Sequence, residues 1–123
     1  MKRVNLQDMT VDQLVQRFTA LAVEQDRASL ANNNAEVIRL FWLLAAIDDE
    51  LKLRHGDQRR ALLRLYDHPN MQVRLKAATV TLAIAPRAAR DVLEVIRASK
   101  QQPQALEAGM SLWNLERGVY KPT

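Results

Sequence analysis

Residues 67–78 read DHPNMQVRLKAA, and this stretch decides the fold. Pro69 ends one helix and can stand in the first turn of the next, because proline lacks the N–H that an interior helical position must donate. After it, Val73 and Ala77 are four residues apart and Leu75 and Ala78 are three apart, the spacing of a helix that buries one face. The stretch predicts two helices joined by a short turn, the second ending near residue 85.

The rest of the chain extends this helical pattern in both directions. There are only three glycines among 123 residues, and β-branched residues nowhere alternate with polar ones. Thr10 and Gln13 have the spacing of a capping box, and Asn33 with Glu36 repeats that spacing ahead of a second helix over about residues 35–55. The other predicted boundaries are Gly56 as a left-handed helix end, Asp57 as a cap, and Pro86 and Pro103 as helix starts. The sequence therefore predicts an all-α chain of about six helices.

An internal repeat arranges these helices. One constant shift along the chain superposes Ala61 on Val92, Leu62 on Leu93, Leu65 on Ile96, Leu75 on Leu106, Ala78 on Gly109 and Leu82 on Trp113. A repeat of this length built from helix pairs is typical of an α-solenoid, so we expect a single domain, 1–123, of three antiparallel hairpins. In this register Trp113 replaces a core leucine, and Trp42 lies within the apolar run 40–47. We therefore predict core positions for both tryptophans rather than roles as anchors for a partner.

Residues 67–78 also resemble a HEAT repeat, with an Asp and a Pro at the turn, then Val73-Arg74 and a pair of small residues. The resemblance implies a HEAT-like fold in which Asp67 and Arg74 belong to a structural ladder between repeats. The next repeat departs from the pattern, because the same shift places Ala105 at the position of Arg74.

Nearly the whole chain is similar to a small bacterial family known only as a domain of unknown function. The similarity rests on Thr10-Val-Asp-Gln-Leu-Val, Gly56-Asp-Gln-Arg-Arg-Ala-Leu-Leu, Tyr66-Asp-His-Pro, Val73-Arg-Leu-Lys-Ala-Ala, Gly109-Met and Lys121-Pro. HEAT-like modules of this kind are associated with bacterial toxin–immunity loci, so the resemblance implies an immunity or adaptor role.

Composition excludes several classes of protein. The chain has no cysteine, and its longest apolar run, 40–47, is much shorter than the roughly 20 residues that a spanning helix needs. MKRVNLQDMT at the N-terminus lacks the apolar core of a secretory signal. We expect a soluble cytoplasmic protein with a modest net charge of +4.

No set of side chains predicts catalysis, a metal site or a cofactor. His55 and His68 are the only histidines and lack further ligands at metal-binding spacing. The acidic run 48–50 has Lys52 and Arg54 at helical pairing distance, which indicates a solvated helix face. Serines lie outside any nucleophile elbow, and no glycine-rich phosphate loop is present.

Recognition of another protein is the function that these exclusions leave. In a solenoid the second helix of each hairpin lines the concave side, so the predicted protein-binding residues are Gln72, Lys76, Thr79, Glu107 and Asn114. The open end of the stack is a further candidate surface, and a homodimer through an uncapped end is another possibility. The alternative function is nucleic-acid binding through Arg87, Arg90 and Arg97, which share a helix face although Asp91 and Glu94 interrupt the array.

Overall fold

The computed structural model describes residues 5–123, and within that range the chain is helical with no β-strand. The α-helices are α1 (Val11–Leu30), α2 (Asn34–Leu53), α3 (Met71–Thr81), α4 (Pro86–Ser99) and α5 (Gln104–Glu116). Two 3₁₀ segments, η1 (Leu6–Asp8) and η2 (Gln58–Asp67), complete the order. Counting η2, the six predicted helices are all present as helical segments.

Three predicted helix starts, at Thr10, Asn33 and Pro86, are confirmed. The Thr10 hydroxyl accepts from Gln13 N–H at 3.1 Å while the Gln13 side chain accepts from Thr10 N–H, which closes the capping box. Asn33 caps α2 by accepting from Glu36 N–H, and Pro86 opens α4. Gly56 has φ of +77°, the left-handed conformation expected after α2.

Two helical segments differ from the prediction. The segment after Asp57 is a 3₁₀ helix rather than an α-helix. Its buried residues Arg59, Leu62 and Leu65 follow the three-residue period of that geometry, and Ala61 is buried beside them. α3 ends at Thr81 instead of residue 85, and residues 82–85 follow as a turn in which the Thr81 carbonyl accepts from both Ile84 and Ala85.

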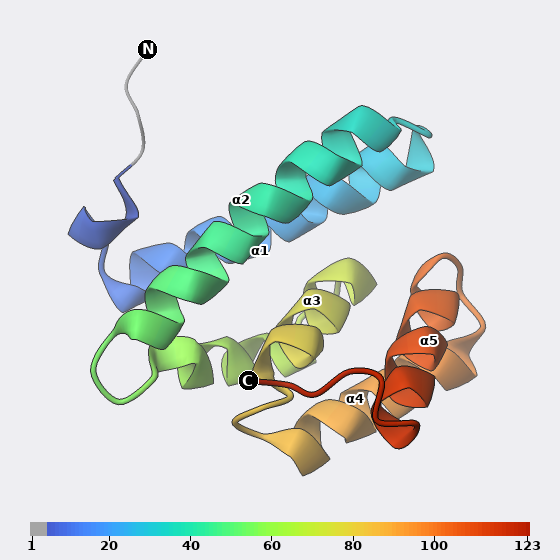
Figure 1. Ribbon diagram of the computed structural model, residues 1–123. Helices are drawn as coiled ribbons and strands as arrows, with labels where there is room; N and C mark the ends of the chain where they lie inside the picture. Colours follow the sequence, from blue (N-terminus) through green and yellow to red (C-terminus); the bar gives the residue numbers. More distant parts are fainter. Residues whose placement is uncertain (1–4) are drawn as a thin grey trace. The chain divides into compact units, whose positions relative to one another are not determined.

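The chain divides into two compact units, one ending at Ala61 and the other comprising Leu62–Thr123. In the first unit, α1 and α2 lie side by side (Figure 1). Both helices bury apolar side chains, among them Leu14 and Phe18 on α1 and Leu40, Ile47 and Leu51 on α2. The prediction of a single domain over residues 1–123 stays a prediction.

The second unit is built around α4, which packs against both α3 and α5, while α3 also contacts α5. Its core consists of Leu75, Ala78, Leu82, Ala89, Leu93, Ile96, Ala108 and Leu112. Each helix of this unit therefore has one face fixed by the core, and the opposite faces determine what the unit can present to a partner.

The repeat register is correct for one helix pair and wrong for the other. Leu93 and Ile96 of α4 are buried, as the repeat predicts. On α5, however, Leu106 and Trp113 are exposed, and the buried apolar residues are Ala105, Ala108 and Leu112. These residues align with Leu75 and Ala78 of α3 and with Leu82 just after it when the shift between the two repeats is one residue shorter.

One residue fewer before α5 thus changes the face that it buries. Each residue turns an α-helix by about 100°, so the shorter spacing rotates the α5 positions named by the repeat away from the core. The large side chains that were expected to fill the layer between helices project into solvent instead.

Candidate functional site

The predicted protein-binding residues do not form an open polar surface. Gln72 is 6% exposed, and its side-chain carbonyl accepts from Gln104 Nε2 at 3.0 Å. Because this contact joins α3 to α5 within the second unit, Gln72 serves helix packing and cannot reach a partner in this structure.

The other predicted binding residues also have partners within the unit. Lys76 Nζ lies 3.5 Å from Glu107 Oε2, a second link between α3 and α5. The Thr79 hydroxyl donates to the Leu75 carbonyl at 2.8 Å. Asn114 is half-buried, and its backbone carbonyl accepts from the N–H groups of Val119 and Tyr120. Of the five residues, Glu107 alone is exposed.

Both tryptophans lie outside the core, which corrects the sequence prediction. Trp42 is 65% exposed and packs edge-to-face on Phe41, with ring centroids 5.1 Å apart. Trp113 is 56% exposed because of the α5 rotation described above. The sequence predicts core positions for both tryptophans rather than roles as anchors for a partner. Because both side chains are exposed, they are accessible to a partner.

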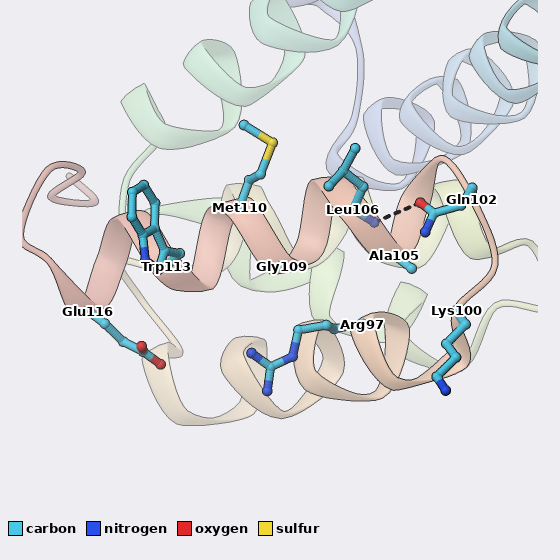
Figure 2. Close-up of a pocket in the computed structure, with 9 residues that line it drawn as sticks. All are labelled: Arg97, Lys100, Gln102, Ala105, Leu106, Gly109, Met110, Trp113 and Glu116. Atoms are coloured by element: carbon cyan, nitrogen blue, oxygen red, sulfur yellow. Dashed lines mark hydrogen bonds between the residues drawn. The ribbon is translucent and has the colours of Figure 1, made fainter.

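Trp113 belongs to a row of large apolar side chains along α5, which we call the α5 stripe: Leu106, Met110 and Trp113. Leu106 is 62% exposed and Met110 56%. Positions i, i+4 and i+7 share one helix face, and Figure 2 shows the three side chains projecting from the same side of α5. Isolated exposed apolar residues are common, but three aligned on one face form a surface that water solvates poorly.

The α5 stripe borders a hollow of about 450 Å³ between α5 and the C-terminal end of α4, which we call the α5 groove. Ala105 and Gly109 line it with small residues, so space remains between the stripe and α4. Arg97 and Lys100 lie along the α4 side, and Glu116 lies at the far end (Figure 2).

Electrostatics distinguish the two sides of the groove. Arg97 forms an ion pair with Glu94 of its own helix at 2.5 Å, and both side chains remain about half exposed. The Arg117 guanidinium lies 4.5 Å from the centroid of the Trp113 ring, so a cation already stacks at one end of the stripe. The groove therefore combines an apolar side with a basic one.

The net charge is concentrated in the unit that contains the groove. Residues 62–123 carry nine basic and five acidic side chains, whereas residues 1–61 carry nine of each. The whole formal charge of +4 thus belongs to the second unit. Arg87, Arg90 and Arg97, the alternative nucleic-acid-binding residues, are all exposed on α4.

The ladder between repeats that the HEAT resemblance implies stays a prediction for Asp67 and Arg74. Asp67 is exposed. Arg74 is half-buried, with its Nε atom fully buried and without a hydrogen bond. It lines a small hollow together with Tyr66 and Asp91.

The histidines occupy turn and helix-end positions. His68 Nδ1 accepts from Asn70 N–H at 3.0 Å, and His55 is exposed after α2. Within residues 5–123 no three His, Asp or Glu side chains gather as a metal site would require, and no helix is long and apolar enough to cross a membrane.

Comparison with known proteins identifies a family and a close structural relative. A family model described as "Domain of unknown function (DUF2019)" matches residues 12–116. The chain is also similar to the crystal structure of the protein RPA1889 from Rhodopseudomonas palustris CGA009, with a TM-score of 0.95 and 52% identity. That match covers 98% of this chain and 100% of the other. No curated protein matches the chain. The resemblance to a domain of unknown function is confirmed, and the resemblance to HEAT repeats stays a prediction.

Proposed function

The chain belongs to the family described as Domain of unknown function (DUF2019), and we propose that it is a non-enzymatic module that binds another protein through the α5 stripe and groove. The single observation behind the proposal is the exposure of Leu106, Met110 and Trp113 on one face of α5. Large apolar side chains that border a hollow stabilise an interface by about 25 cal/mol for each Å² removed from water.

The residue types support recognition of a protein. Tryptophan and arginine are enriched among the residues that contribute most to protein interfaces, and methionine adapts its shape to a partner. In the α5 groove, Trp113, Met110 and Arg97 lie together beside small residues. Such an arrangement offers a pocket with anchors around it.

The finer parts of the proposal rest on resemblance. We propose a short HEAT-like solenoid acting in the cytoplasm as an adaptor or immunity protein, in which the groove holds the partner. Catalysis, cofactors and membrane insertion are not part of this proposal. A homodimer is a further proposal that sedimentation velocity over a range of concentrations tests directly.

Affinity capture from native cells, followed by reconstitution with the purified captured protein, tests the proposed function. The test variant is L106A/M110A/W113A, and the matched control W42A/L53A removes exposed apolar surface from the other unit. We expect the control variant to capture a protein in stoichiometric amounts and the stripe variant not to capture it. With the purified partner, the stripe variant should bind at least about tenfold more weakly than wild type, a difference of 1.4 kcal/mol. Equal capture and affinity for both variants would remove the α5 surface from consideration.

Nucleic-acid binding is the second candidate, favoured by the three exposed arginines on α4 and by the positive charge of the second unit. A basic helix face attracts phosphates, and its affinity falls steeply with salt. A gel shift at low salt with wild type and R87Q/R90Q tests it. Absence of a shifted band for the wild type would dispose of this candidate.

A further inference from the structure

We propose that the occupant of the α5 groove is an amphipathic helix of another protein that carries acidic residues on the flank facing α4. This inference rests on the proposed function and adds the chemistry of the partner. It follows from the shape of the α5 stripe and from the distribution of charge around the groove.

The shape matches a helix. Leu106 and Trp113 are seven residues apart, so the stripe extends about 10 Å along α5, or about two helical turns. An amphipathic helix presents apolar side chains at the same spacing, and docking of an apolar helix face into a groove is a common mode of recognition. Gly109 and Ala105 leave room beside the stripe for the incoming side chains.

The charge selects an acidic helix. Arg97 and Lys100 stand on the α4 side of the groove, opposite the apolar stripe. The bond from Arg97 to Glu94 is a surface pair between half-exposed side chains, and such pairs contribute about 0–1 kcal/mol. A partner carboxylate that loses water against the stripe can therefore take its place.

Charge also orients the occupant. Lys100 lies at the end of the groove near Leu106, whereas Glu116 lies at the opposite end near Trp113 (Figure 2). Lys100 follows the last residue of α4 and has a left-handed backbone, with φ of +59°, so the end of the helix fixes its position. The acidic residues of the occupant should lie toward Lys100 and Arg97, because at the other end Glu116 and the Arg117 guanidinium on Trp113 offset each other in charge.

The test uses defined probes with the full chain. A fluorescent peptide of about 18 residues, long enough to be partly helical, carries leucines at helical spacing and glutamates on one flank. Three probes serve as comparisons: the same peptide with lysines for glutamates, a scrambled acidic peptide, and a short DNA duplex. Fluorescence anisotropy measures the Kd of each, and circular dichroism verifies that every protein variant is folded.

We expect the acidic helical peptide to bind at least about tenfold more tightly than the lysine and scrambled peptides, a difference of 1.4 kcal/mol. W113A should weaken this binding about tenfold, which is the size of effect seen for a buried aromatic anchor. R97Q/K100Q should weaken it severalfold. R87Q/R90Q removes the same charge from α4 outside the groove and should change it less than about twofold at physiological salt.

Several results would overturn the inference. Equal affinity for the scrambled peptide would show attraction by charge alone, and equal affinity for the lysine peptide would remove the acidic requirement. Preferred binding of DNA would move the function to the arginine face. A dimer in sedimentation that W113A dissociates would make a second copy of this chain the occupant.

The inference and the proposed function can fail separately. If no peptide binds while a captured protein still depends on the α5 stripe, the groove recognises a protein of different chemistry and the acidic-helix inference is wrong. If neither the peptide nor a captured protein depends on the stripe, both proposals are wrong.

Discussion

At the scale of single residues, the first unit contains a buried arginine that interacts with two aspartates whose pKa values are shifted in opposite directions. Arg59 is 5% exposed, and its Nε and Nη2 donate to the two carboxylate oxygens of Asp57 at 2.9 and 2.7 Å. These hydrogen bonds lower the pKa of Asp57 below its ordinary value. Burial raises the pKa of Asp48, although the positive charge of Arg59 acts in the opposite direction. Asp48 Oδ1 is buried and accepts no hydrogen bond.

Replacing Asp48 by asparagine should stabilise the protein at neutral pH. Because its pKa is raised in the folded state, the stability that Asp48 contributes is present when it is protonated and is lost as pH rises through the folded pKa. D48N removes the buried charge, so we expect a higher Tm than wild type at pH 7 and no difference near pH 3. Thermal unfolding across this pH range measures the effect, and a lower Tm for D48N at pH 7 would show that its attraction to Arg59 outweighs its desolvation.

The Asp57→Asn substitution should have the opposite pH dependence. A lowered folded pKa means that the ion pair stabilises the protein above the unfolded pKa of Asp57, and that this stability is lost as pH falls through the folded pKa. Because the substitution removes the carboxylate that accepts two hydrogen bonds from the buried guanidinium, we expect a loss of about 1–3 kcal/mol at neutral pH. Urea unfolding at neutral and acidic pH measures it, and a loss that persists unchanged in acid would contradict the assignment to charge.

At the scale of helices, the residues at helix ends predict the helix boundaries, whereas the internal repeat predicts the wrong buried face for α5. Thr10, Asn33, Gly56 and Pro86 set helix boundaries through their own backbone and side-chain chemistry, so the sequence alone was sufficient to place them. The face of α5 was harder to predict, because it depends on one residue of spacing relative to α3. The apolar pattern of α5 permits either face inward, and packing against Leu93 and Ile96 decides between them.

The α5 stripe is not evident from the sequence for the same reason. The repeat aligns Trp113 with a core leucine, which leaves polar positions such as Gln72 as the predicted binding surface. The sequence does contain a signal for the correct face of α5. When the shift between the repeats is one residue shorter, Ala105, Ala108 and Leu112 align with the apolar residues 75, 78 and 82.

The buried amide pair between α3 and α5 should contribute to the stability of the second unit. Q104L leaves the Gln72 side chain without its donor at 3.0 Å, and Q72L does the reverse. A buried polar group that loses its partner costs about 1–3 kcal/mol, so each single variant should be less stable than wild type by that amount. Urea unfolding of both single variants and the double variant gives the coupling energy: the double variant should lose less stability than the two single losses added together, because it removes both polar groups. Additive losses would show that the two amides act independently.

Gly109 should be dispensable for folding but not for binding. A Cβ at this position would lie 3.5 Å from Arg97 Cδ, an ordinary contact, so alanine fits and close helix approach does not require glycine. G109A should raise the free energy of unfolding by about 0.5–1 kcal/mol, since alanine favours a helix over glycine. The new methyl group enters the α5 groove, so the acidic helical peptide should bind severalfold more weakly. Measured together, a stability gain with unchanged peptide affinity would show that the occupant does not reach this part of the groove.

At the scale of the whole molecule, the two units differ in net charge: the first is neutral and the second is basic. The first unit balances nine basic residues with nine acidic ones and uses pairs such as Arg59–Asp57 and Arg54–Glu50 within itself. The second unit has four more basic than acidic residues and bears them largely on exposed helix faces. The composition predicts the net charge of +4 for the chain but does not show where the excess positive charge lies. That requires the division of the chain near residue 61, which the sequence does not predict.

This distribution predicts how an acidic partner approaches and leaves the second unit. Exposed charges outside an interface accelerate association and are screened by salt, whereas buried anchors control dissociation. In stopped-flow measurements with the acidic helical peptide, R87Q/R90Q should lower the association rate constant about two- to threefold at low salt and leave the dissociation rate unchanged. At about 0.5 M salt the difference should vanish. W113A should instead raise the dissociation rate about tenfold with little change in association. If R87Q/R90Q accelerated dissociation, these arginines would contact the peptide directly, and the docking surface would have to extend from the α5 groove along α4.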